Sequence, residues 1–141
     1  MRQLSPYPLW VGNVAEARDL RTVLAAGITA IVDLAANEPP VPVTRELSYC
    51  RFPLVDGPEN ESWLVRAAVE TTASLIRSRV PTLVCCGAGM SRSPAIAAAA
   101  LAVAEGRPPQ ECLAFVAQSG ACDVSPGLWQ QASSVSSAAM V

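Results

Sequence analysis

The sequence predicts a single α/β domain in which a central, mostly parallel sheet of four to five strands is flanked by helices. Short apolar segments alternate along the chain with longer segments of helical periodicity, a pattern typical of parallel sheets. The length of 141 residues suits one domain with one hydrophobic core. We see neither an internal repeat nor a domain boundary, so we expect one domain over 1–141, with a frayed tail over about 134–141.

Four segments are predicted to form strands. The first is followed by Gly12-Asn13, and the last begins at Pro81 and is short and mostly apolar, as expected for a strand buried in a parallel sheet. The segments 37–42 and 55–58 are rich in turn residues and are expected to be loops. The strand candidates are 7–11, 28–34, 47–54 and 81–85.

Five segments are predicted to form helices. In the first, Val14, Ala17 and Leu20 could share one face, and Gly27 stands where a glycine often ends a helix. In the third, Pro94 falls in the first turn, where proline is tolerated. The helix candidates are 14–26, 61–79, 93–104, 109–119 and 126 to about 138.

The composition excludes several classes of function. A net charge of −2 indicates no broad basic surface, so nucleic acid is not expected as a partner. The chain has no histidine, which excludes histidine acid–base catalysis, Ser-His-Asp hydrolysis and histidine-ligated zinc. The five cysteines are odd in number and the expected context is intracellular, so a disulfide framework is not predicted. They contain no Cys-x-x-Cys pair, so a four-cysteine zinc site is not predicted either.

The sequence also predicts a cytoplasmic protein without a membrane partner. The most apolar run, 95–104, is too short to span a bilayer and is followed by Glu105. The first ten residues lack an apolar segment followed by a cleavage site, so no secretory signal is expected.

The chemistry concentrates in the stretch LVCCGAGMSRSPAIAAAALA, which spans 83–102. In parallel sheets, ligands bind beyond the carboxyl ends of strands, and the loop from Cys86 to Arg92 lies at such a position. Its backbone amides can turn inward, and the helix that follows presents the positive end of its dipole. Gly87 and Gly89 permit a tight turn and leave room for an oxyanion. The loop is therefore predicted to be an anion pocket.

Two nucleotide-binding motifs are excluded at this loop. The run Gly87-Ala88-Gly89 begins like G-x-G-x-x-G, but Arg92 stands where the third glycine is needed. No suitable acidic residue follows about 20 residues later. A Walker A loop requires a lysine, and the chain contains none.

The cysteine and the arginine of the loop indicate nucleophilic attack on phosphorus. Inward amides, a helix N-terminus and a guanidinium all favour the thiolate of Cys86. Arg92 can hold two oxygens as a fork, and the same donors would stabilise a trigonal-bipyramidal transition state. Ser93 is expected to donate a hydrogen bond to the sulfur and ease its departure. Each of these residues alone would suit a structural role, but their combination favours a catalytic site.

The run from Cys86 to Ser93, CGAGMSRS, resembles the Cys-x5-Arg-Ser/Thr signature of the cysteine-dependent protein tyrosine phosphatases, in their compact dual-specificity branch. The resemblance extends to LWVGNVAEARDLRTVLAAGITAIVDLA and to GRPPQECLAFVAQSGACDVSPGLWQQ, and so covers nearly the whole chain. It implies a phosphocysteine mechanism without cofactor or metal. It also implies that the substrate phosphate is held by the loop residues Gly87, Ala88, Gly89, Met90, Ser91 and Arg92.

The resemblance further implies a general acid on a separate loop, and Asp56 in FPLVDGPEN matches that position. Such an acid protonates the leaving oxygen and later activates water. Aspartate before Gly-Pro is also a common turn former, but beside the signature loop we favour the acid. Asp33 and Asp123 are weaker candidates with expected capping or structural roles. Gln131 matches a glutamine common in the family, and a packing or capping role is expected for it.

Cys85 departs from the family pattern, in which most members carry histidine before the nucleophile. This departure leaves open how reactive Cys86 is, and whether a neighbouring thiol traps it after oxidation. We favour a buried packing role for Cys85, because a disulfide between adjacent cysteines is strained.

The leading function is a metal-independent phosphomonoester hydrolase acting on phosphotyrosine and phosphoserine or phosphothreonine in proteins, with a monomer favoured. The interior of the loop has no extra basic residue, whereas relatives that act on inositol phospholipids resemble each other in carrying lysines there. RNA 5′-phosphates and small phosphoesters stay open as substrates. The alternatives are a rhodanese-like sulfurtransferase, which would need neither Asp56 nor Ser93, and an inactive phosphate-binding module, which only Cys85 supports.

Overall fold

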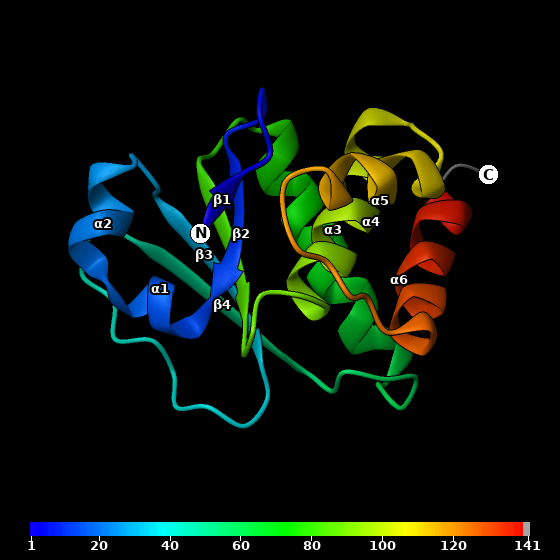
Figure 1. The fold of residues 1–141 in the computed structure, drawn as a ribbon, viewed down its shortest axis with the longest axis horizontal. Coiled ribbons are helices and arrows are strands. Elements are labelled where there is room, and N and C mark those ends of the chain that lie inside the picture. Colours follow the sequence, from blue (N-terminus) through cyan, green and yellow to red (C-terminus); the bar gives the residue numbers. More distant parts are fainter. Residues whose placement is uncertain (140–141) are drawn as a thin grey trace.

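The computed structural model describes residues 1–139 and confirms the predicted fold class. Five strands form one sheet in the order β1-β2-β5-β3-β4, in which β1 is antiparallel to β2 and the other pairs are parallel (Figure 1). The strands are β1 (Arg2–Gln3), β2 (Leu9–Asn13), β3 (Ala30–Ala35), β4 (Ser48–Leu54) and β5 (Thr82–Cys86). The strand β5 that leads into the signature loop is thus central, between β2 and β3.

Helices cover both faces of the sheet. The helices α1 and α2 lie on one face, and the other four lie on the opposite face (Figure 1). The bounds are α1 (Val14–Arg18), α2 (Leu20–Ala25), α3 (Ser62–Arg77), α4 (Arg92–Glu105), α5 (Pro109–Ala117) and α6 (Pro126–Ala139). Within the described residues, no helix has the length and apolar character needed to cross a membrane.

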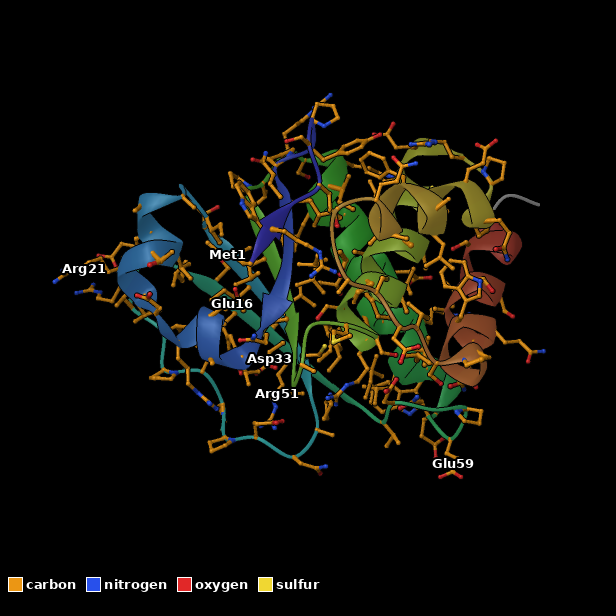
Figure 2. All side chains as sticks on the ribbon, in the orientation of Figure 1. Met1, Glu16, Arg21, Asp33, Arg51 and Glu59 are labelled. Atoms are coloured by element: carbon orange, nitrogen blue, oxygen red, sulfur yellow. The ribbon has the colours of Figure 1, made fainter. Side chains whose placement is uncertain are left out.

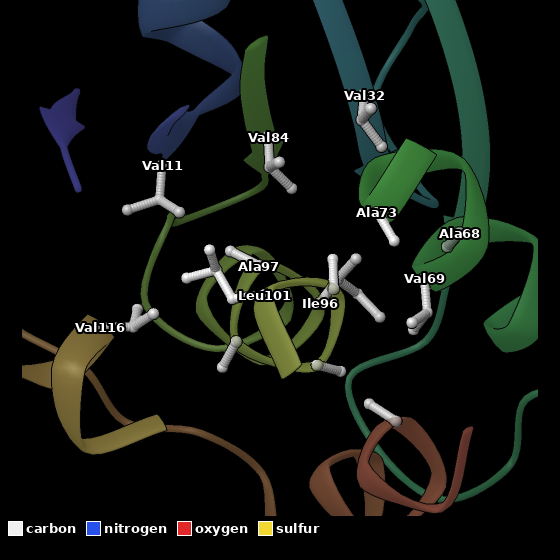
Figure 3. Close-up of a cluster of buried hydrophobic side chains, with 14 of the residues drawn as sticks. Val11, Val32, Ala68, Val69, Ala73, Val84, Ile96, Ala97, Leu101 and Val116 are labelled. Carbon is white, nitrogen blue, oxygen red and sulfur yellow. The ribbon is translucent and has the colours of Figure 1, made fainter. Parts of the chain in front are cut away.

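The main core is built around α4, whose alanine-rich sequence lets it lie close to the sheet and to three other helices at once. All residues from Ser93 to Ala102 are buried. A helix that is apolar on every side is a buried one. Ile96, Ala97 and Leu101 lie in the cluster shared with the sheet and with α3 (Figure 3). This packing fixes the N-terminus of α4, and therefore Arg92, relative to the end of β5.

The predicted elements need two corrections. The helix expected over 14–26 is two helices, because Asp19 ends α1 and caps α2 by accepting hydrogen bonds from the amide and the hydroxyl of Thr22, at 3.3 and 2.7 Å. A polar side chain that binds the backbone ahead of it competes with helix continuation. The strand β1 was not expected; with two residues it carries no periodicity, and pairing with Val11 and Trp10 forms it.

At the C-terminus, α6 continues to Ala139, and the hydroxyl of Ser136 is buried and donates to the carbonyl of Ala99 at 2.9 Å. The last two residues of the tail expected to fray, 140–141, lie outside the described residues.

Candidate active site

Cys86 and Arg92 frame the signature loop at the carboxyl edge of the sheet. Cys86 is the last residue of β5, and Arg92 is the first residue of α4. The sulfur is almost fully enclosed, since Cys86 is only 1% exposed. The tight connection places the thiol directly below the N-terminus of a buried helix, where backbone N–H groups are unpaired within the helix.

Two of these backbone groups bind the sulfur. The amide of Gly89 donates to Cys86 Sγ at 3.2 Å, and the amide of Ser93 donates to it at 3.4 Å. Such donors stabilise negative charge on sulfur. The arrangement therefore suits a thiolate nucleophile.

The hydroxyl of Ser93, which the sequence predicted to be a donor to the sulfur, makes its hydrogen bond elsewhere. It donates instead to the carbonyl of Gly12 at 3.2 Å, and only the backbone N–H of Ser93 reaches Cys86 Sγ. The hydroxyl is buried, so it needs a protein partner, and the nearby end of β2 supplies one. Its bond ties α4 to β2 beneath the loop.

Gly89 is the residue that makes the loop close. Its φ of +74° lies in the left-handed region, and a Cβ there would stand 2.8 Å from the carbonyl carbon of Gly12 and 2.9 Å from its oxygen. Glycine alone satisfies both requirements. The close approach also aims the Gly89 amide at the sulfur.

We expect Gly89→Ala to lower kcat/KM for an aryl phosphate by roughly tenfold or more, because moving the loop withdraws a donor of the anion cradle. The matched control is Gly106→Ala, which has a φ of +64° at the end of α4 but no atom within 4 Å of the added Cβ. Both variants lose about 1 kcal/mol of unfolding free energy from the left-handed backbone. Thermal unfolding and steady-state kinetics separate the effects; equal activity losses in the two variants would contradict the role of Gly89.

Arg92 connects the loop to the end of β4. Its Nη1 donates to the carbonyl of Leu54 at 3.0 Å, and its Nη2 lies over Gly87, 2.8 Å from where a Cβ would stand. A side chain at Gly87 would therefore displace the guanidinium. Since Leu54 directly precedes the loop that carries Asp56, one side chain positions both parts of the site.

Asp56 is exposed and lies at the rim of a cavity that Cys86 and Arg92 also line. Its Oδ1 accepts a hydrogen bond of 2.5 Å from the hydroxyl of Ser91, which in turn accepts one of 2.9 Å from the amide of Ser125. The cavity has a volume of about 160 Å³. Its lining consists of Asp56, Cys86, Ala88, Met90, Ser91, Arg92 and Asp123. The structure thus brings Asp56 together with both ends of the signature loop.

The two other aspartates considered from the sequence differ in position. Asp123 lines the cavity, and its amide donates to the carbonyl of Met90 at 2.8 Å. The sequence could not predict that Asp123 lines the cavity, because it showed only that the residue precedes the last helix. Asp33 lies on β3, the strand beside β5 (Figure 2). It is buried, and its carboxylate accepts hydrogen bonds from the amide of Ala35 and the hydroxyl of Tyr49, so its role is structural.

Cys85 faces the side of the sheet opposite to Cys86, because neighbouring residues of a strand point to opposite faces. It is buried beside Asp33, and burial together with that carboxylate raises the pKa of the Cys85 thiol. Burial, with the hydrogen bond to Asp33, likewise raises the pKa of Tyr49 to about 12. A protonated thiol on the far face is poorly placed to trap an oxidised Cys86. The geometry favours the packing role.

No metal-ligating cluster is found in the described part of the chain, where groups of three or more histidine, cysteine, aspartate or glutamate side chains do not converge.

Comparison with known proteins supports the fold. A scan against protein-family models finds no match, and a search of curated proteins finds none. Solved structures do match. Human DUSP28 is 22% identical, with a TM-score of 0.85 over 98% of this chain and 96% of its own. DUSP15 is 27% identical, with a TM-score of 0.81 over 99% of this chain and 89% of its own.

A third structure, human tyrosine phosphatase-like serine/threonine/tyrosine-interacting protein, is 21% identical, with a TM-score of 0.85 over 100% of this chain and 98% of its own. The chain therefore has the fold of the compact dual-specificity phosphatases, and the resemblance predicted from the signature loop is confirmed.

Proposed function

We propose that this chain, with its dual-specificity phosphatase fold, is a metal-independent phosphomonoester hydrolase that works through a phosphocysteine on Cys86. The observation that carries the proposal is the position of the sulfur. It accepts two backbone hydrogen bonds at the base of a cavity that Arg92 and Asp56 also line. A buried thiolate in an anion cradle is a nucleophile directed at a bound oxyanion.

In the first step, Cys86 Sγ attacks phosphorus while the bond from phosphorus to the leaving oxygen breaks. Asp56 in its protonated form gives its proton to that oxygen. Arg92 and the loop amides hold the three equatorial oxygens, whose charge develops in the transition state. In a chain without histidine, a carboxyl at the cavity rim is the natural proton donor.

In the second step, the Asp56 carboxylate takes a proton from water, and the resulting oxygen attacks the phosphorus of the phosphocysteine. The bond from sulfur to phosphorus breaks, phosphate leaves, and the electron pair returns to Cys86 Sγ. The backbone N–H of Ser93 binds the departing thiolate, and its hydroxyl serves the structure through Gly12.

The charges around the cavity support phosphotyrosine and phosphoserine or phosphothreonine in proteins as substrates. Arg92 is the basic residue of the lining, and Asp56 and Asp123 are acidic. The chain has no lysine to place there. A head group with several phosphates would find no cation other than Arg92 in this lining and would also meet the carboxylate of Asp123, and like charges held this close repel each other. One phosphate on an otherwise weakly charged chain fits better.

The test is release of phenolate from an aryl phosphate and of phosphate from phosphotyrosine and phosphoserine peptides, with reductant and a metal chelator present. We expect turnover that the chelator leaves unchanged. Absence of turnover across mildly acidic to neutral pH, with phosphopeptides still bound, would instead support the phosphate-binding module. A persulfide on Cys86 after incubation with thiosulfate, seen by mass spectrometry, would support the sulfurtransferase.

A further inference from the structure

The loop that carries Asp56 is closed by the side chain of Asn60. The Asn60 Oδ1 accepts a hydrogen bond of 2.7 Å from the amide of Val55, and its Nδ2 donates to the carbonyls of Val55 and Gly57 at 2.9 and 3.0 Å. These peptide groups lie on both sides of Asp56. One carboxamide therefore fixes the backbone from which the carboxylate extends.

Asn60 is itself held by Gln131 of α6. The Gln131 Nε2 donates to the carbonyl of Asn60 at 2.8 Å, and its Oε1 accepts from the Asn60 Nδ2 at 3.3 Å. A second contact fastens the same loop to the same helix. A Cβ on Gly127 would stand 2.8 Å from the ring of Pro58, so this ring packs against the backbone of Gly127 without room for a side chain. We name Asn60 and Gln131 the loop brace.

Burial contributes little to the order of this loop. Val55 is 50% exposed, and Asp56, Pro58 and Glu59 are also exposed; Glu59 points outward from the loop (Figure 2). Without a buried apolar side chain, the conformation of the loop depends on hydrogen bonds and on the contact between Pro58 and Gly127. The hydrogen bonds of the loop brace hold the backbone of the loop, and the hydrogen bond from Ser91 holds the carboxylate of Asp56.

We infer that Asn60 and Gln131 are positioning residues, which hold Asp56 where it can protonate the leaving oxygen. The inference rests on the function proposed above. A general acid acts only within hydrogen-bond reach of the oxygen, at roughly 2.6 to 3.2 Å. A displacement of about 1 Å can cost on the order of 10²-fold in rate. Neither residue lines the catalytic cavity, so each acts through Asp56.

The leaving group provides the test, because a weakly basic phenolate departs without a proton and a strongly basic one does not. For Asn60→Ala, we expect kcat/KM to fall roughly tenfold or more with phenyl phosphate, and less than about threefold with 2,4-dinitrophenyl phosphate. Gln131→Ala is expected to show the same dependence with a smaller loss. The matched control is Gln130→Ala, an exposed neighbour on α6, with wild-type values for both substrates. Circular dichroism and thermal unfolding verify that each variant is folded. If Asn60→Ala is not folded, the comparison of the two substrates is made with Gln131→Ala.

A double-mutant cycle with Asp56→Asn completes the experiment. If the loop brace acts through Asp56, Asn60→Ala makes no further difference in the Asp56→Asn background. The inference would be overturned by equal losses for both aryl phosphates, by additive losses in the cycle, or by wild-type kinetics in both brace variants. In each of these cases the phosphatase proposal stands, because the wild type still turns over. Absence of turnover in the wild type would end both proposals.

Discussion

Replacement of Cys86 with serine is expected to abolish the turnover of aryl phosphates, with a loss of at least roughly 10⁴-fold in kcat. Serine keeps the size of the side chain and its place beneath the amides of Gly89 and Ser93. Its hydroxyl remains protonated and is a far weaker nucleophile than a thiolate. Steady-state kinetics measures turnover, and a binding assay with inorganic phosphate measures the anion pocket. We expect phosphate binding to persist in Cys86→Ser when turnover is lost.

Cys85→Ser is the matched control for Cys86→Ser. The two residues are adjacent and buried, but their side chains lie on opposite faces of the sheet. We expect the control to keep kcat within about threefold of the wild type, because serine can occupy the same pocket beside Asp33. Comparable losses in the two variants would mean that the effect comes from the strand rather than from the nucleophile.

Arg92→Lys is expected to lower kcat/KM by roughly 10²- to 10³-fold. The guanidinium donates to the carbonyl of Leu54 while it lines the cavity, and a single ammonium cannot reproduce this fork. Lysine therefore loses either the grip on the phosphate oxygens or the tie to β4. The measurement is steady-state kinetics, together with the inhibition constant of inorganic phosphate.

Arg51→Lys controls for the general effect of losing a half-buried guanidinium. Arg51 donates to the carbonyls of Ala35 and Glu38 near the same edge of the sheet, but it does not line the catalytic cavity. We expect this variant to lose stability without a comparable loss of activity. An Arg92→Lys enzyme within about threefold of the wild type would remove Arg92 from the mechanism.

Local sequence patterns predicted the parts of the fold that local chemistry determines. The apolar segment before Cys86 and the alanine-rich segment after Ser93 are read correctly because each is long and uniform. The break at Asp19 was missed because a side chain that accepts from Thr22 gives no periodic signal. The strand β1 exists only through its pairing with β2.

The residues of the candidate site likewise fall into those that the sequence could predict and those that only the fold brings together. The signature loop is contiguous, so its residues could be named from the sequence, and the resemblance supplied Asp56. The partner of the Ser93 hydroxyl, the place of Asp123 in the cavity and the bond between Asn60 and Gln131 depend on elements far apart in the chain. Asn60 and Gln131 are 71 residues apart, and only the packing of α6 brings them together.

Direct detection of the intermediate tests the central claim. The wild type and Cys86→Ser would be mixed with an aryl phosphate, quenched after one turnover, digested and examined by mass spectrometry under conditions that preserve phosphocysteine. The account predicts phosphate on the peptide that contains Cys86 in the wild type, and none in the variant. Turnover with phosphate on another residue, or turnover that persists in Cys86→Ser, would contradict it.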